Sequence, residues 1–342
     1  MPSSLEGKNA LIVGITGQDG SFLAEQLLAK GYRVFGMVRR LSIPNTSNIE
    51  SVLERVTLID GDLHDQVSLD SAIKRAEPDE VYNLAAQSFV GVSFSQPVVT
   101  GEVTGLGVVR LLEAVRRHAD RARLYQAASS EMFGKVSVSP QDESTPFHPR
   151  SPYGVAKAYA YWACVNYRES YGMFASNGIL YNHESERRGL EFVTRKIAHG
   201  VVRVLNGQIE RIHLGTLTTK RDWGYAPEYT DLMWRMLQYG TPDDFIGATG
   251  QSHSVGDFAR LAFEKVGIVD WESRVVLDPS FSRPAEVDTL CGNASKAREL
   301  LGWTPRVKFE ELVGLMVEAE LSRYRKANQV GPRVEPSRGQ EH

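Results

Sequence analysis

A tyrosine and a lysine four residues apart, Tyr153 and Lys157, are the first candidates for chemistry in this sequence. On a helix, residues i and i+4 share one face, and Pro149 and Pro152 favour a helix start just before the pair. The lysine could then lower the pKa of the phenol and bind a neighbouring ligand, which would make the tyrosine an acid or base near neutral pH. The same spacing is common on exposed helix surfaces, so the pair alone does not establish a site.

A hydroxyl and a carboxylate, Ser129 and Glu131, follow the strand predicted at residues 123–127. Ligands of open α/β sheets bind at the carboxyl ends of the strands, which would place both side chains in the binding crevice. The same residues are equally suitable for the N-cap of a helix. Both interpretations therefore stay open at this point.

The elements that would position these residues begin with a strand, turn, helix and strand at the start of the chain. Apolar runs at 9–14 and 33–38 flank an amphipathic segment at 21–30, as in a dinucleotide-binding βαβ unit. Glycines in the turn let backbone N–H groups and the helix N-terminus approach a pyrophosphate, although the spacing is G-x-x-G-x-x-G rather than G-x-G-x-x-G. The predicted cofactor-binding residues of the turn are Gly14, Thr16, Gly17, Gln18, Asp19 and Gly20.

Two arginines, Arg39 and Arg40, follow the second strand, where a cofactor with a free 2′-hydroxyl usually meets a carboxylate. No carboxylate stands there, and two cations suit a 2′-phosphate. The sequence therefore predicts NADP rather than NAD. The alternative is a solvated basic pair at a strand end.

Further strands are predicted at 56–60, 80–85 and 174–181, with a long helix at 103–118. This alternation predicts an α/β fold with a Rossmann-type, doubly wound parallel sheet. Asp62 could contact an adenine or cap the next helix. Small residues at 85–88 would let a nicotinamide ribose pack closely against the backbone.

The second half alternates less regularly and predicts a smaller, substrate-binding C-terminal lobe. A polar loop is predicted at 182–189, and helices at 194–206, 227–238, 255–266, 296–301 and 309–325. Arg188, Arg221 and Arg283 lie on separate loops and could bind a diphosphate, although single loop arginines are usually solvated. We expect an NADP-binding domain at 1–181, a substrate lobe at 182–326 that partly returns to the sheet, and a disordered tail at 327–342.

The overall composition narrows the class of protein. The chain has 342 residues, of which 42% are hydrophobic and 24% charged, as in ordinary globular proteins. A net charge of -3 gives no general attraction to nucleic acid or to an anionic membrane. Two cysteines imply no disulfide framework, and neither a signal peptide nor a spanning apolar run is recognisable. We expect a cytoplasmic protein without a metal site.

The glycine-rich turn, Ser129, Tyr153 and Lys157 together resemble the extended short-chain dehydrogenase/reductase family. More specifically, eight segments spread over nearly the whole chain resemble those of GDP-mannose 4,6-dehydratases. The central and later segments are highly specific to these enzymes, whereas the glycine-rich turn and the Tyr/Lys pair are shared by the wider family. The eight segments are 14–21, 83–88, 150–157, 166–169, 182–185, 192–196, 220–224 and 283–288.

The resemblance implies a reaction. Tyr153 would take the proton of the sugar 4-hydroxyl while hydride passes from C4 to NADP+, with Lys157 tuning the phenol and holding the nicotinamide ribose. Ser129 stands where the family usually has threonine, and would hydrogen-bond the same sugar oxygen. Glu131 would remove the C5 proton and help the C6 hydroxyl leave as water. Because Ser130 provides no second acid, Glu131 would act as both base and acid, and the hydride would return to C6.

The resemblance also implies binding residues. The remaining cofactor contacts would come from Asp62, Leu63, Leu84, Ala85, Ala86, Gln87, Ser88, His183 and Arg188. The GDP-sugar contacts would come from Ser88, Ser129, Glu131, Asn182, Lys196, Arg221, Arg283 and Glu286. The chain departs from the family at Phe89 and Ser176, where many relatives have histidine and cysteine.

The family's usual substrate is GDP-mannose, and the loop at 39–46 matches one that reaches a neighbouring subunit's cofactor in tetrameric relatives. We therefore expect a homodimer or homotetramer. GDP-mannoheptose is an alternative substrate for the same chemistry. A 4-epimerase has no use for a carboxylate at Glu131, and a non-catalytic NADP-binding sensor has no need of all four catalytic side chains.

Overall fold

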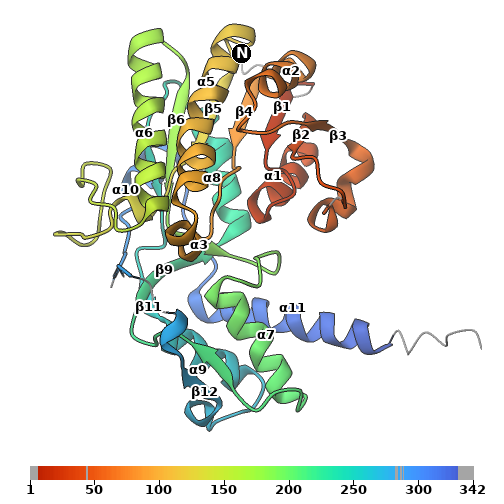
Figure 1. Ribbon diagram of the computed structural model, residues 1–342, viewed down its shortest axis with the longest axis vertical. Coiled ribbons are helices and arrows are strands. Elements are labelled where there is room, and N and C mark those ends of the chain that lie inside the picture. Colours follow the sequence, from red (N-terminus) through yellow and green to blue (C-terminus); the bar gives the residue numbers. More distant parts are fainter. Residues whose placement is uncertain (1–6, 44, 282–283, 286, 288, 330–342) are drawn as a thin grey trace, which may run out of the picture.

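A seven-stranded parallel sheet forms the centre of the larger domain in the computed structural model, which describes residues 7–43, 45–281, 284–285, 287 and 289–329 (Figure 1). The strand order β10-β6-β5-β4-β1-β2-β3 confirms the predicted Rossmann-type fold. The strands are β1 (Asn9–Val13), β2 (Arg33–Val38), β3 (Val56–Asp60), β4 (Glu80–Asn83), β5 (Arg123–Ala127), β6 (Ala175–Leu180) and β10 (Phe245–Gly247). All five residues of β1 are buried, because helices cover both faces of the sheet.

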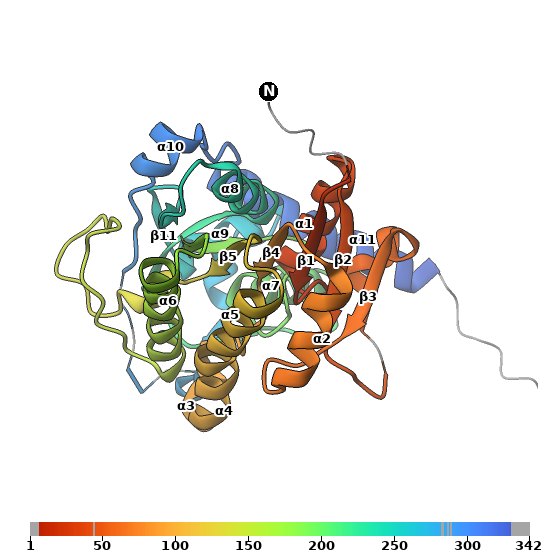
Figure 2. The same ribbon diagram turned by 90° about the horizontal axis from the view of Figure 1, so that it is seen from above.

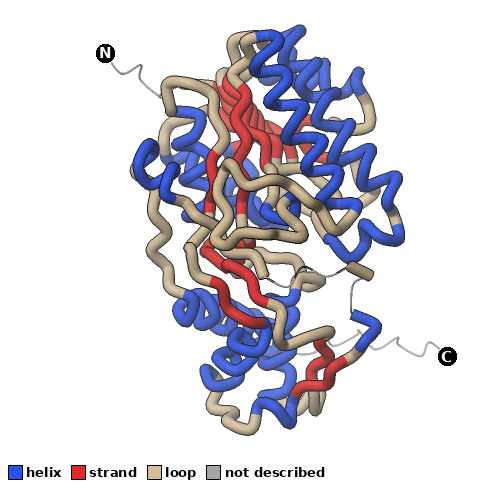
Figure 3. The backbone as a smooth tube through the Cα atoms, turned by 90° about the vertical axis from the view of Figure 1, so that its left-hand side faces the viewer, coloured by secondary structure: helices blue, strands red, loops and turns tan. Residues whose placement is uncertain are grey.

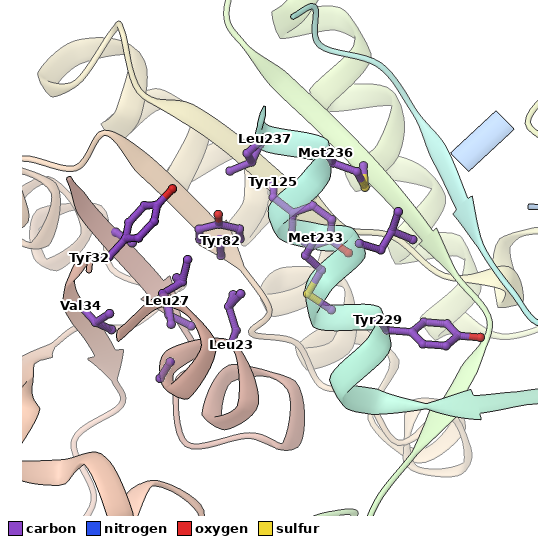
Figure 4. Packing of buried hydrophobic residues seen from close by; sticks show 14 of the residues in the cluster. Leu23, Leu27, Tyr32, Val34, Tyr82, Tyr125, Tyr229, Met233, Met236 and Leu237 are labelled. Atoms are coloured by element: carbon purple, nitrogen blue, oxygen red, sulfur yellow. The ribbon is translucent and has the colours of Figure 1, made fainter. Parts of the chain in front are cut away.

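Two helical layers cover the sheet (Figure 2). One face carries α1 (Gln18–Ala29) and α8 (Ala226–Gln238), and the other carries α2 (Gln66–Ala76), α5 (Gly107–His118) and α6 (Pro152–Tyr171). Leucines of α1 and methionines of α8 pack on Tyr82 and Tyr125 of the central strands (Figure 4). The core thus fixes the carboxyl ends of the strands between the two helical layers.

The predicted helix at 103–118 begins earlier and is irregular. The structure has α3 (Val90–Ser95), α4 (Pro97–Thr100) and a π-helical turn (Gly101–Leu106) before α5. Glycines in this segment allow close packing, since a Cβ at Gly107 would lie 2.8 Å from the Leu63 side chain. The irregularity follows from tertiary contacts that the helical periodicity does not reveal.

The C-terminal lobe lies against the carboxyl edge of the large sheet (Figures 1 and 3). It contains two small sheets, β11-β9-β7 and β12-β8, and helices that share one hydrophobic core. Its elements are β7 (Asn182–Glu184), α7 (Val193–Leu205), β8 (Ile212–Leu214), β9 (Lys220–Tyr225), β11 (Ser252–Ser254), α9 (Val255–Lys265), β12 (Val275–Leu277) and α11 (Phe309–Gln329). The prediction of an uninterrupted loop at 182–189 was therefore wrong at β7, which pairs with β9.

The second half also returns to the large sheet, through α8, β10 and α10 (Ser295–Leu301). Short 3₁₀ helices occupy Ser47–Arg55, Ser130–Met132, Trp271–Arg274 and Pro279–Phe281. The domain boundaries given above remain a proposal. Of the predicted tail at 327–342, the first residues continue α11 to Gln329, and 330–342 lie outside the described residues. No helix in the described ranges is long and apolar enough to cross a membrane.

Candidate active site

A cavity of about 530 Å³ lies between the carboxyl edge of the large sheet and the C-terminal lobe. Both parts of the chain contribute to its wall. Thirteen predicted site residues line it: Asp19, Leu84, Ala86, Ser88, Ser129, Glu131, Tyr153, Lys157, Asn182, His183, Arg188, Lys196 and Arg221. The structure therefore brings together side chains that are up to about two hundred residues apart in the sequence.

Helix α6 carries the Tyr153/Lys157 pair on its buried face. The Ser151 hydroxyl caps the helix by accepting the Gly154 N–H at 3.0 Å, and Pro152 occupies the first turn. Tyr153 is 8% exposed and Lys157 3% exposed, whereas Val155 on the other face is 56% exposed. The pair is thus not part of a solvated helix surface.

The two side chains are held by the end of β5 rather than by each other. Lys157 Nζ donates to the Ala127 carbonyl at 2.6 Å and lies 5.7 Å from the centroid of the Tyr153 ring. Burial raises the pKa of Tyr153 to about 12, although a hydrogen bond with Ser129 lowers it in part. Burial likewise lowers the pKa of Lys157 to about 8, and the charge of Asp19 opposes that effect. The expected lowering of the phenol pKa is therefore wrong for the protein without ligands, because desolvation dominates.

Ser129 both caps a turn and lines the cavity, so the structure is compatible with both interpretations of this residue. Its Oγ accepts the Glu131 N–H at 3.2 Å and so caps the 3₁₀ turn at Ser130–Met132. The same side chain lines the cavity. The Glu131 carboxylate is buried, with Oε1 4.0 Å from Arg221 Nη2 of the C-terminal lobe. Arg221 Nη1 donates to the Val287 carbonyl at 2.7 Å, which fixes the guanidinium.

An ion pair joins Asp19 of α1 to His183 of β7. His183 Nε2 lies 2.8 Å from the Asp19 carboxylate, Nδ1 lies 2.7 Å from the Tyr181 carbonyl, and the ring stacks on Tyr229. Although burial favours the neutral ring, Asp19 raises the pKa of His183 above its usual value. Burial alone would raise the pKa of Asp19, but His183 holds it below its usual value. Because both ring nitrogens face oxygen acceptors, the arrangement favours the imidazolium.

Other side chains reinforce this junction. Gln18 Nε2 donates to the His183 carbonyl at 3.1 Å, and Ser185 Oγ donates to Gln18 Oε1 at 2.8 Å. Arg188 Nε lies 3.1 Å from Glu184 Oε2, and its guanidinium lies 3.6 Å from the centroid of the Phe192 ring. The sequence contains no signal for these contacts, since their partners are either distant in the chain or within a segment predicted as a loop.

The glycine-rich turn has the geometry of a pyrophosphate site. Gly14 has φ +90°, and a Cβ at Gly20 would lie 2.4 Å from the Gly14 carbonyl oxygen. Helix α1 begins at Gln18, three residues before the prediction, and no side chain caps its first N–H groups. Free N–H groups at a helix N-terminus next to obligatory glycines suit an anionic cofactor, so the turn fits a dinucleotide.

The remaining predicted cofactor residues surround this turn without lining the cavity. Arg39 and Arg40 are exposed beyond β2, and Ala85 N lies 3.0 Å from where a Gly14 Cβ would be. Asp62 accepts the His64 N–H at 2.9 Å and does not cap α2, which Asp65 does. Three further predicted residues follow strands of the same edge: Thr16, Leu63 and Gln87.

The structure leaves some predicted residues untested and adds others. Arg283 and Glu286 lie outside the described residues, so only two of the three predicted diphosphate arginines can be placed at the cavity. Glu184 and Phe192 also line the cavity and were not singled out from the sequence. No group of His, Cys, Asp and Glu suited to a metal ion occurs in the part of the chain that the structure describes.

Comparisons with known proteins cover almost the whole chain. Residues 11–316 match the family model described as GDP-mannose 4,6 dehydratase. The chain is 50% identical to GDP-mannose 4,6 dehydratase 2 of Caenorhabditis elegans, over 93% of this chain and 90% of that protein. It is 48% identical to the human GDP-mannose 4,6 dehydratase, over 91% of both.

Among solved structures, the fold is similar to that of the UDP-glucose 4-epimerase of Thermus thermophilus in complex with NAD. The TM-score is 0.81 at 26% sequence identity, over 91% of this chain and 98% of that one.

Proposed function

This chain belongs to the GDP-mannose 4,6-dehydratase family, and from that premise we propose that its cavity converts GDP-D-mannose to GDP-4-keto-6-deoxy-D-mannose. The protein is a nucleotide-sugar hydro-lyase. One observation supports the assignment of residues: Ser129, Glu131, Tyr153 and Lys157 come from two separate segments and line one cavity. These are a hydroxyl, a carboxylate, a phenol and an ammonium, which together suffice for proton transfer at three sugar positions.

Each side chain has a distinct part in the proposed reaction. Tyr153 accepts the proton of the sugar 4-hydroxyl, and Ser129, which lines the cavity with it, orients that oxygen. Glu131 accepts the C5 proton, which a 4-ketone makes acidic, and returns a proton to the departing C6 hydroxyl. When hydride adds to C6, C5 regains a proton from solvent, which balances the proton that Tyr153 took from the 4-hydroxyl. Lys157 supplies positive charge beside the phenol, which favours the phenolate. All four residues are buried at the cavity wall, which limits their contact with bulk water.

The family uses a nicotinamide cofactor, and we propose NADP. When bound, it accepts the hydride from C4 and returns it to C6. The glycine-rich turn and the uncapped start of α1 would hold its pyrophosphate, and the exposed Arg39 and Arg40 would contact a 2′-phosphate. Calorimetric titration with NADP+ and NAD+ tests this proposal. Replacing both arginines by alanine should weaken NADP+ binding and leave NAD+ binding unchanged.

The GDP-sugar would lie toward the C-terminal lobe. Arg188, Lys196 and Arg221 line that side of the cavity and provide the cations that a diphosphate requires. Asn182 would hydrogen-bond the sugar, and the proposal extends to Arg283 and Glu286, which the structure does not describe.

We also propose a homodimer or homotetramer, since α6 exposes Val155, Tyr159 and Trp162, which an interface would cover. A cytoplasmic location agrees with the two free cysteines. Light scattering after size-exclusion chromatography measures the assembly.

The decisive experiment follows the product and the cofactor together. Purified protein with NADP+ and GDP-mannose should form the 4-keto-6-deoxy sugar without accumulating NADPH, because the hydride returns to the same molecule. Glu131→Gln should reduce dehydration by about 10²–10⁴-fold and leave cofactor affinity unchanged. Glu191→Gln is the matched control, since Glu191 lines the same cavity but is exposed. Steady NADPH accumulation by the wild type, or normal turnover of Glu131→Gln, would refute the assignment. Parallel assays with GDP-mannoheptose measure the selectivity for the sugar.

A further inference from the structure

A glycine inside helix α6, Gly154, directly follows Tyr153 and is buried. Glycine in the first turn of a helix loses more conformational freedom on folding than alanine would, so its presence needs a structural reason. Backbone conformation is not that reason, because Gly154 is not among the residues with positive φ. Space is the reason: a Cβ at this position would lie 2.7 Å from the Glu131 carbonyl oxygen and 3.0 Å from Pro149 Cβ.

Three residues of α6, Tyr153, Gly154 and Lys157, lie against the end of β5 and the turn that follows it. Lys157 Nζ donates to the Ala127 carbonyl at 2.6 Å, and the Ser129 hydroxyl lies near enough to Tyr153 to lower the pKa of the phenol in part. Between these two side chains on the helix, the bare backbone of Gly154 packs against that of Glu131. The first turn of α6 therefore approaches the 129–131 turn as closely as a residue without a side chain allows.

We propose that Gly154 is a positioning residue for the dehydration, setting the separation between the phenol of Tyr153 and the carboxylate of Glu131. The proposal rests on the function proposed above, in which these two groups act on neighbouring carbons of one bound sugar. Tyr153 exchanges a proton with the oxygen on C4. Glu131 removes the proton from C5 and protonates the hydroxyl on C6. Because both groups must reach the same sugar without its moving, their separation determines whether oxidation is followed by elimination.

Alanine at this position would force the two segments apart. Ordinary carbon contacts begin near 3.4 Å, so the backbones would separate by about 0.7 Å. The atom that a Cβ meets is a backbone oxygen, which cannot rotate away as a flexible side chain would. Misplacement by about 1 Å can reduce a rate by about 10²-fold, so Gly154→Ala should reduce turnover by about 10- to 100-fold.

The test compares Gly154→Ala with Gly314→Ala. Gly314 also lies in a helix, α11, but a Cβ there would meet only the Lys265 side chain, at 3.7 Å. Both full-length variants are incubated with NADP+ and GDP-mannose in D2O. The measurements are product, NADPH absorbance, deuterium at C5, and the affinity for NADP+. Gly314→Ala should behave as the wild type does.

For Gly154→Ala we expect normal NADP+ affinity, lower turnover, and a larger ratio of trapped NADPH to product. That ratio does not depend on the fraction of folded enzyme, so a merely structural defect would leave it unchanged. Wild-type turnover, or lower turnover with an unchanged ratio, would overturn the proposal. If the wild type forms no 4-keto-6-deoxy sugar, the proposed function fails first, and the two failures are thereby distinguished.

A second variant keeps the test valid if Gly154→Ala does not fold. Ser151→Ala removes the hydrogen bond that holds the Gly154 N–H and loosens the same turn without adding an atom there. It should raise the same ratio by a smaller factor, about 2- to 5-fold. An unchanged ratio in this variant, together with a lower melting temperature, would also overturn the proposal.

Discussion

Replacing Lys157 by methionine should stabilise the protein without ligands while it removes activity. Burial lowers the pKa of this ammonium from 10.5 to about 8. That difference corresponds to about 3 kcal/mol of unfavourable free energy at neutral pH. Methionine fills a similar volume without charge but loses the hydrogen bond to the Ala127 carbonyl, worth about 1 kcal/mol. The carbonyl keeps a second donor, Gln126 Nε2 at 2.9 Å. We therefore expect a net gain of about 2 kcal/mol.

The shifted pKa of Lys157 also predicts how the difference in stability between variant and wild type changes with pH. Because the folded-state pKa of Lys157 lies below the unfolded one, the destabilisation is complete below about pH 8 and disappears as the pH rises toward 10.5. The advantage of Lys157→Met should therefore shrink by about 1 kcal/mol between about pH 7 and about pH 9. Urea denaturation of both proteins measures this difference, with Lys74→Met on the exposed side of α2 as the control.

Activity should fall in parallel, by about 10²–10³-fold, because a neutral side chain cannot stabilise charge on the phenol. If the variant is less stable than the wild type at neutral pH, or if its gain in stability does not depend on pH, then burial of the ammonium does not destabilise the protein and the prediction is refuted.

Two further predictions concern ion pairs. Asp19→Asn should destabilise the protein by about 3 kcal/mol by breaking the pair with His183. The pKa of Asp19 is lowered, so its contribution is lost as the pH falls through the folded pKa, and that of His183 is raised, so its contribution is lost as the pH rises through it. The difference between variant and wild type should thus be largest between those limits in denaturation measured over pH. Arg168→Met should cost about 3–5 kcal/mol, because it leaves Asp244 buried without the guanidinium that bonds both carboxylate oxygens. A thermal melting curve measures this loss of stability. Unchanged affinity for NADP+ would show that the substitution does not alter the cofactor site.

The start of the chain was predictable because its signals are local. A short buried strand, a glycine turn and an amphipathic helix each follow from neighbouring residues. Strands β1 and β2 lie where these patterns predict them, and α1 begins three residues earlier. The Tyr153/Lys157 pair was also recognisable, since helical spacing determines that both lie on one face.

The helices predicted for the second half are confirmed, but the strands of the C-terminal lobe were less predictable because some of their buried groups are polar. Strand β9 carries the buried Arg221 and Asp222, which no hydrophobic alternation would select. Asp222 accepts hydrogen bonds from the backbone of Thr249 and Gly250, and His183 pairs with a carboxylate 164 residues away. Such partners compensate the burial of charge, but only the folded chain shows them. The pKa of Tyr153 was misjudged for the same reason, since desolvation is a tertiary property.

The lysines that line the cavity, Lys157 and Lys196, differ electrostatically from the buried ion pair between Arg168 and Asp244. Arg168 and Asp244 satisfy each other, and despite burial the pKa of Asp244 is held below its usual value. Burial instead lowers the pKa of both Lys157 and Lys196, and both face the same cavity. Burial removes water from these ammonium groups, and contacts within the protein do not fully compensate for that loss. An anionic ligand beside them would supply the missing stabilisation and so favour its own binding. A diphosphate and a phenolate are anions of the required kind, which supports the proposed roles of both lysines in binding and catalysis.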